Sequence, residues 1–167
     1  VLDFSTMTTS NPINHVYVVP SVLTKQQGVT LIDLAIGYTE ANCGWQTDRH
    51  KDYKTTDIDI AVCGGELLDT CNAYLQTRIL PLLAHLFGFP MIDFAIEDLF
   101  LAKYSAAEGQ QRFLSQHRDD SELSFVITLN DPKTDFCGGG TRFVLHDKTL
   151  APHIPGTGVF FSCRHLS

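Results

Sequence analysis

After residue 96 the chain is built from short apolar runs that are separated by Gly, Pro and polar residues. The runs are rich in β-branched and aromatic side chains, which favour strands, while Gly and Pro favour the turns between them. Several short strands at this spacing predict an antiparallel barrel or jelly roll. The expected strands cover residues 99–104, 113–119, 123–130, 138–144 and 158–165.

The first 95 residues predict two helices and fewer strands. An apolar run over residues 16–20 is typical of a strand, and a helix is expected to follow over residues 24–36. A longer helix is expected over residues 66–87, where Pro81 would bend or interrupt it. Further strands are expected over residues 44–45 and 55–62. The fold class predicted from these elements is mainly β with flanking helices (α+β).

We expect residues 1–167 to form a single domain, because a chain of this length can bury one sizeable core. In this division residues 96–167 form the jelly-roll core, and residues 1–95 supply supporting helices and strands. The segment that joins the two predicted helices has two interpretations: a lid over a substrate, or a folded surface loop with one anchored Trp. Its candidate lid residues are Trp45, Arg49, His50 and Tyr53.

Composition and charge narrow the class of partner. The net charge is −7 without a Lys/Arg cluster, so long polyanions such as DNA and RNA would be repelled. No apolar run approaches the ~20 residues of a membrane span. The five Cys include no C-x-x-C pair, which disfavours a zinc finger and leaves the disulfide state and the compartment open. The composition favours a neutral or basic protein or peptide, or a small metabolite, as partner, and it does not define the oligomeric state.

His117-Arg118-Asp119 is the strongest candidate for a chemical site. Residues two apart in a strand point to the same side, so His117 and Asp119 would present an imidazole and a carboxylate to one point. A third ligand must come from a distant strand, and His165 is placed to supply it. Two His and one carboxylate bind Fe(II) on one face and leave other coordination positions open. His146 is the rival third ligand, but it lies in a polar turn sequence.

Three segments in this order resemble the Fe(II)- and 2-oxoglutarate-dependent oxygenases of the prolyl and lysyl hydroxylase type (prolyl 4-hydroxylase-like). They are residues 116–130 (QHRDDSELSFVITLN), residues 135–143 (DFCGGGTRF) and residues 155–165, in which Gly158 and two Phe precede His165. The resemblance implies a double-stranded β-helix core with iron held by His117, Asp119 and His165. It also implies that O2 and 2-oxoglutarate are consumed while a C–H bond is hydroxylated, with ascorbate as a further candidate cofactor.

The same resemblance suggests how 2-oxoglutarate would be held. Tyr104, at the end of an expected strand, is the candidate phenol, although local packing explains it equally well. Thr128 and Asn130 are candidates to line the same cavity, and Thr128 has ordinary strand packing as its alternative. The family places a basic anchor about ten positions after the distal His, on the last core strand. We therefore expect the anchor and the final strand to lie beyond Ser167.

The function predicted from these features is a dioxygenase that hydroxylates a prolyl or lysyl side chain of a protein or peptide. A hydroxylase of a free amino acid or metabolite is the alternative within the superfamily. A jelly-roll module that binds metal or protein without catalysis is the alternative from another class. Variable loops select the substrate in such folds, so the shared core does not identify it.

Overall fold

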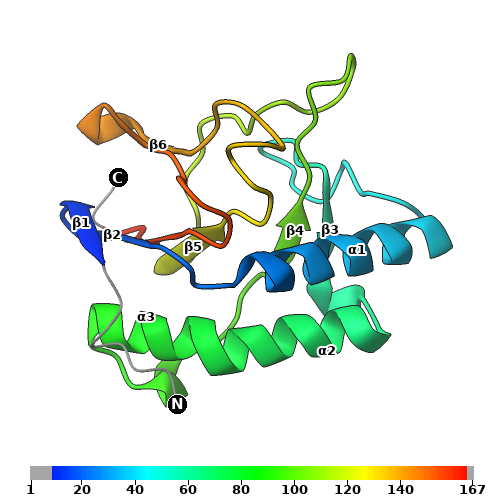
Figure 1. Ribbon diagram of the computed structural model, residues 1–167. Helices are drawn as coiled ribbons and strands as arrows, with labels where there is room; N and C mark the ends of the chain where they lie inside the picture. Colours follow the sequence, from blue (N-terminus) through cyan, green and yellow to red (C-terminus); the bar gives the residue numbers. More distant parts are fainter. Residues whose placement is uncertain (1–8, 165–167) are drawn as a thin grey trace.

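The computed structural model describes residues 9–164 and combines helices with antiparallel sheets (Figure 1). A continuous helical rod runs along one side of the molecule, with α1 beside its α2 half, the main sheet beside its α3 half, and the long loops on the far side of both (Figure 1). Helix accounts for 31% of the structure and strand for 20%. The expected mixture of helices and sheets is confirmed, but helices contribute more than a mainly β fold would have.

The main sheet has four antiparallel strands in the order β1-β2-β8-β5. Its strands are β1 (Ser10–Ile13), β2 (Val16–Val19), β5 (Leu123–Ile127) and β8 (Gly158–Ser162). β8 lies in the centre, between the first hairpin of the chain and β5. The strands predicted over residues 16–20, 123–130 and 158–165 are thereby confirmed in their main part. The sheet joins segments from both ends of the described chain.

Helix α1 (Lys25–Ala41) begins with a capping box at Thr24, which confirms the predicted helix start near residue 24. The Thr24 hydroxyl accepts from the Gln27 N–H, and the Gln27 side chain accepts from the Thr24 N–H. Further along, Gly28 is buried where the helix approaches the chain that follows β5. A Cβ on Gly28 would lie 2.8 Å from the carbonyl oxygen of Leu129. Glycine therefore allows this close contact between helix and sheet.

The second predicted helix forms as one rod with a wider turn in its middle. It consists of α2 (Gly65–Tyr74), a π-helical turn (Leu75–Ile79) and α3 (Leu80–Phe87). The N–H of the first α3 residue bonds to the carbonyl of the first π residue, five positions earlier. Pro81 follows directly and has no N–H to donate. The sequence predicts that Pro81 bends or interrupts the helix. In the structure the helix widens into the π turn just before Pro81 and then continues (Figure 1).

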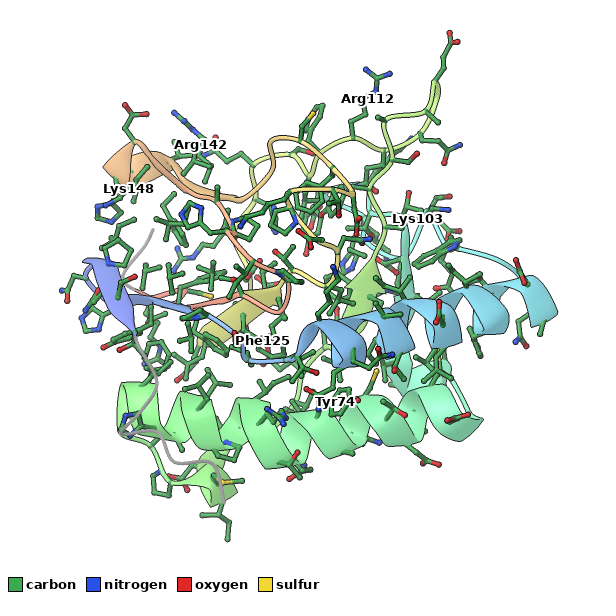
Figure 2. The ribbon with its side chains drawn as sticks, viewed as in Figure 1. Tyr74, Lys103, Arg112, Phe125, Arg142 and Lys148 are labelled. Carbon is green, nitrogen blue, oxygen red and sulfur yellow. The ribbon has the colours of Figure 1, made fainter. Side chains whose placement is uncertain are left out.

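The main hydrophobic core lies between the helical rod and the sheet. Phe160 of β8 is fully buried there, and Phe125 of β5 packs against it with ring centroids 6.0 Å apart. Figure 2 shows Phe125 between the strands and the helices, and Tyr74 on the rod below. The buried members of this cluster are Val19, Val22, Leu75, Ile79, Leu80, Leu82, Leu83 and Phe160. A second buried cluster joins α1 to α2 and to the segment around β3.

Two pairs of short antiparallel strands complete the structure. β3 (Asp57–Asp59) pairs with β4 (Phe100–Ala102), and β6 (Thr141–Phe143) pairs with β7 (Lys148–Leu150). The short 3-10 helices are η2 (Ile60–Val62), η4 (Met91–Asp93) and η5 (Val144–His146). The β6–β7 hairpin packs on the face of the main sheet that points away from the helical rod. The cluster between them contains Ile13, Val16, Phe143, Leu150 and Val159.

Some expected strands are wrong. Residues 113–119 form an irregular segment that pairs with no strand of the described chain, so the H-x-D lies on a loop. The expected strand over residues 138–144 begins only at Thr141, because the three preceding glycines have positive φ angles, the last of 112°. Residues 44–45 form no strand, and residues 60–62 of the strand expected at 55–62 are 3-10 helical.

Between residues 9 and 164, no helix has both the length and the apolar character needed to cross a bilayer.

Candidate metal centre

The side chains of the H-x-D meet although they lie on a loop. His117 Nε2 lies 3.1 Å from Asp119 Oδ1, and the two side chains are 24% and 28% exposed. The other ring nitrogen, Nδ1, lies 2.9 Å from the carbonyl oxygen of Ser115. A carbonyl only accepts, so this bond places the proton on Nδ1 and leaves the Nε2 lone pair facing the carboxylate. The predicted convergence of His117 and Asp119 is present in the described structure.

Two electron-rich atoms this close need a positive charge between them. A divalent cation bound to both atoms would supply it. Two donors that are each about 2.1 Å from one ion, at right angles to one another, are about 3.0 Å apart. The His117–Asp119 separation of 3.1 Å therefore has the donor types and the spacing of two adjacent ligands.

The end of β8 lies close to this pair. The Cys163 N–H donates to the Glu122 carbonyl at 3.0 Å, and the Cys163 thiol donates to the Ser124 hydroxyl at 3.3 Å. Burial raises the pKa of the Cys163 thiol, and the negative charge of Asp119 adds to this increase. The predicted third ligand, His165, is two residues further on and lies outside the described residues. Among residues 9–164, no three His, Cys, Asp or Glu side chains gather as a metal site.

An aromatic pair covers the imidazole of His117. The Tyr53 ring lies over His117 with centroids 4.1 Å apart and an interplanar angle of 32°. His50 stacks on Tyr53 in turn, with centroids 4.9 Å apart and planes at 16°. Burial raises the pKa of the Tyr53 phenol, and the nearby carboxylates, Asp119 first among them, raise it further. Two of the four candidate lid residues thus stand directly beside the H-x-D, and the phenol of Tyr53 is neutral at physiological pH.

A buried ionic cluster lies next to His50, one member of this aromatic pair. Asp57 is fully buried at the start of β3, and Arg49 Nε donates to one of its oxygens at 2.8 Å. The other Asp57 oxygen lies 3.4 Å from His50 Nε2. Arg49 also donates to Asp98, at 2.9 and 3.0 Å. Burial opposes the charge on Arg49, but its hydrogen bonds to Asp57 and Asp98 outweigh burial and raise the pKa of the guanidinium.

Sequence reasoning did not identify Asp57 and Asp98. Their partner, Arg49, was predicted to lie either in a lid or in a folded surface loop, and it is 49 positions from Asp98 in the sequence. The alternation of Asp and Ile at residues 57–60 by itself predicts exposed carboxylates, whereas the structure places the Asp57 side chain on a buried face. A charge on such a face requires a partner of opposite charge. Arg49 in this role makes the segment part of the folded interior as well as a cover for the site.

The predicted co-substrate residues lie in different surroundings. Tyr104 follows β4 and is half-exposed, and its partial burial together with the charge of Asp57 raises the pKa of its phenol. The Thr128 backbone bonds to residues 156 and 157, beyond the end of β5. The Asn130 amide donates to Asp135 within a surface turn. Tyr104 is thus close to the ionic cluster, whereas Asn130 is engaged in a local turn. Their roles toward 2-oxoglutarate stay predictions.

His146, the rival third ligand, lies in η5 at the exposed turn between β6 and β7. Arg142 and Lys148 mark this hairpin in Figure 2, on the opposite side of the view from Lys103, which follows β4. The Arg142 guanidinium pairs with Asp147 at the same turn. This part of the hairpin is a solvated turn, as its sequence predicts.

Comparisons with known proteins give one distant relative. No family model matches the chain. The chain is 30% identical over 146 residues to the multifunctional procollagen lysine hydroxylase and glycosyltransferase LH3 of Rattus norvegicus. The match covers 81% of this chain and 18% of the relative, so the chain spans less than a fifth of that protein's length. At this distance the similarity relates the chain to hydroxylases at the level of the superfamily.

Proposed function

We propose that this chain contains the catalytic site of an Fe(II)- and 2-oxoglutarate-dependent dioxygenase that hydroxylates a prolyl or lysyl side chain of a protein or peptide. The observation that carries the proposal is the geometry of the H-x-D. Its imidazole and carboxylate face each other at 3.1 Å, and a backbone carbonyl fixes the imidazole tautomer that a metal requires. The position of these residues beside the end of β8, where the predicted third ligand follows, supports the same assignment.

The relative supports hydroxylation in particular. Its name joins two activities, a lysine hydroxylase and a glycosyltransferase. The H-x-D and the strand after it are hydroxylase features of this chain, and a hydroxylase of this type needs the nitrogen and oxygen donors that His117 and Asp119 supply. We therefore assign the hydroxylase activity to this segment.

The residues of the site would have separate roles in binding iron and in binding the co-substrate. His117, Asp119 and His165 would hold the iron, and Tyr104 and Thr128 would contact the co-substrate. When bound, the iron would supply oxidative chemistry that couples conversion of 2-oxoglutarate and O2 to succinate and CO2 with hydroxylation of a C–H bond. The protein residues orient the two substrates and exclude water.

The layered structure supports the proposed jelly roll. The β6–β7 hairpin lies across one face of the main sheet, and apolar side chains of both fill the space between them. A jelly roll is built from two such facing antiparallel sheets. In this arrangement β5 and β8 pair over their whole length, so that the start of β5, which follows the H-x-D loop, lies beside the end of β8, after which His165 follows in the sequence.

The charges around Tyr53 favour a basic substrate within this class. Three carboxylates, those of Asp98, Asp119 and Asp120, act on the Tyr53 phenol, and the Arg49 guanidinium, which pairs with Asp98, opposes them only in part. A cationic side chain would be attracted to a neutral aromatic ring with carboxylates beside it. The overall charge of −7 acts in the same direction over longer distances. Between the two proposed side chains, lysyl fits this environment better than prolyl.

The test is an anaerobic titration of the full-length protein with Fe(II) and 2-oxoglutarate. Chelation of iron by 2-oxoglutarate gives a weak visible charge-transfer band, which we expect in the wild type. The band should disappear in His117→Ala, Asp119→Ala and His165→Ala. His146→Ala is the matched control, because it removes an exposed His from the β6–β7 turn and should leave the band unchanged.

A turnover assay completes the test. The wild type should convert 2-oxoglutarate to succinate in the presence of a Lys-containing peptide, and a Pro-containing peptide of equal length and charge compares the two substrate side chains. His117→Ala and Asp119→Ala should abolish turnover with little loss of folding, since both side chains lie on an irregular surface loop. Unchanged 2-oxoglutarate decarboxylation in these variants would refute the assignment.

A further inference from the structure

We propose that Tyr53 is a positioning residue for the metal ligand His117, and that His50 and the buried Asp57 hold Tyr53 in place. The inference rests on the proposed function, because it assigns His117 to a metal. It adds the segment between α1 and β3, which carries Tyr53, to the structure that the metal centre requires. The evidence is a continuous set of contacts from a buried carboxylate to the imidazole of His117.

A loop histidine can rotate about two side-chain bonds, so it needs more than one contact to fix its ring. The bond from Nδ1 to the Ser115 carbonyl holds one edge of the His117 ring but permits it to swing about that bond. Tyr53 covers the ring face at 4.1 Å between centroids and blocks this movement. Together the two contacts determine the direction of the Nε2 lone pair. No strand pairing restrains residues 113–119 within the described chain, which makes the side-chain contacts the more important.

The Tyr53 ring is itself restrained by its stacking contact with His50. His50 stacks on the opposite side of Tyr53 and also packs against Phe100 of β4, with centroids 5.3 Å apart. The Arg49 guanidinium lies over the same Phe100 ring, 4.6 Å from its centroid. Arg49 donates to Asp57, which has no exposed surface, and His50 Nε2 lies 3.4 Å from the other Asp57 oxygen without forming a hydrogen bond. The set therefore ends on the antiparallel pair of strands β3 and β4.

The same cluster does not make a second metal site. His50 Nε2 faces Asp57 at 3.4 Å and Asp98 at 4.0 Å, which brings one imidazole and two carboxylates together. The Arg49 guanidinium already bridges the two carboxylates and supplies the positive charge that a cation would bring. The cluster therefore supports the neighbouring ring rather than binding an ion.

The chemistry of tyrosine is consistent with a positioning role. What His117 contacts is a neutral aromatic face. Phenylalanine offers the same face, so Tyr53→Phe should preserve the effect, whereas Tyr53→Ala removes the face and leaves space for the imidazole to turn.

The experiment measures Co(II) binding to the full-length protein by its visible absorption, without 2-oxoglutarate or peptide. Residues that orient a metal ligand typically change metal affinity by about 10- to 100-fold. We expect Tyr53→Ala to weaken Co(II) binding by at least about tenfold and Tyr53→Phe to stay within about threefold of wild type. Phe89→Ala, which removes a half-exposed ring in the loop after α3, is the control and should bind as the wild type does.

Proton NMR of the metal-free protein tests the contact itself. The ring current of Tyr53 should shift the His117 ring protons upfield, and the shift should be lost in Tyr53→Ala and retained in Tyr53→Phe. Equal Co(II) affinity of Tyr53→Ala and wild type would overturn the positioning role. Failure of the wild type to bind Co(II) through His117, as judged with His117→Ala, would instead overturn the proposed function, and the positioning inference with it.

Discussion

The helix-backed core and the H-x-D region keep their shape by different forces. In the core, Phe160, Val19 and their neighbours are fully buried apolar side chains, and burial of nonpolar area stabilises them without demanding one exact geometry. In the H-x-D region, rings stack and charges pair across irregular segments. Several of its buried polar atoms have no hydrogen-bond partner among the described residues. They are Arg49 Nη2, His50 Nε2, Thr55 Oγ1, Asp57 Oδ2 and Gln111 Oε1.

The difference shows what each region can tolerate. An apolar core loses stability roughly in proportion to the volume removed, and it accepts other hydrophobic residues of similar size. A polar cluster depends on each partner, because removing one leaves another charge buried and unpaired. Evolution of the core can therefore proceed by small steps, whereas the cluster around Asp57 has to change as a unit. The predictions below test this contrast.

The largest effect is expected in the core. Phe160→Ala should lower the free energy of unfolding by about 3–5 kcal/mol, because it leaves a large cavity between sheet and helical rod. Val126→Ala on neighbouring β5 is the control, and it should cost less than about 1 kcal/mol because Val126 is 48% exposed. Urea unfolding monitored by circular dichroism measures both. Similar losses in the two variants would show that the buried cluster does not dominate the stability of the sheet.

The sequence predicts the core much better than the site. The strand at residues 123–130, the strand at residues 158–165 and the helix start near residue 24 follow from local signals: alternating or β-branched residues and a capping box. These signals act over a few residues and match the final structure because packing reinforces them. Of the metal candidates, His117 and Asp119 converge as their spacing indicates.

The parts that the sequence did not predict depend on long-range contacts. Residues 113–119 carry strand-like residues but find no pairing strand in the described chain, so the local preference has nothing to support it. The pairing of Arg49 with Asp98 and the packing of Tyr53 on His117 join residues 49 and 64 positions apart. Short-range patterns carry no information on which of many charges or rings will meet. His117 and Asp119 were thus identified from the sequence, and the contacts that support them were not.

The second effect concerns the ionic cluster. Asp57→Ala should destabilise the protein by about 2–3 kcal/mol, because Arg49 keeps Asp98 as a partner but loses its hydrogen bond to the fully buried carboxylate. Asp52→Ala is the matched control: it removes the same charge from an exposed position of the same segment and should change stability by less than about 0.5 kcal/mol. Thermal unfolding compares the two. If Asp57→Ala proves as stable as Asp52→Ala, the ionic cluster is not a structural requirement.

The third effect compares two glycines of α1. Gly28→Ala should destabilise by about 1–3 kcal/mol, because the new Cβ would lie 2.8 Å from the Leu129 carbonyl oxygen and would push the helix from the sheet. Gly37→Ala meets no atom within 4 Å and should stabilise by about 0.5–1 kcal/mol through the better helix propensity of Ala. Opposite signs from the same substitution in one helix separate packing from propensity. Two stabilising substitutions would mean that α1 does not depend on close approach to the chain after β5.

The smallest effect tests an ion pair at the surface. Lys25 Nζ lies 3.0 Å from Asp131, and the pair joins the start of α1 to the turn after β5. A hydrogen bond from the Lys133 N–H and the Lys25 partner hold the pKa of Asp131 below its ordinary value. A carboxyl with a lowered folded-state pKa stabilises the protein above its unfolded-state pKa of about 3.9, and this contribution is lost as the pH falls through the folded-state value.

Asp131→Asn should therefore lower the unfolding midpoint slightly and equally between pH 5 and pH 8, and the difference from wild type should shrink below about pH 4. The contrast with Asp57 lies in exposure: Lys25 is 64% exposed, so water screens its charge and little is lost when the partner is removed. Midpoints from urea titrations at several pH values measure this. A loss as large as that of Asp57→Ala would show that burial does not decide which ion pairs of this fold matter.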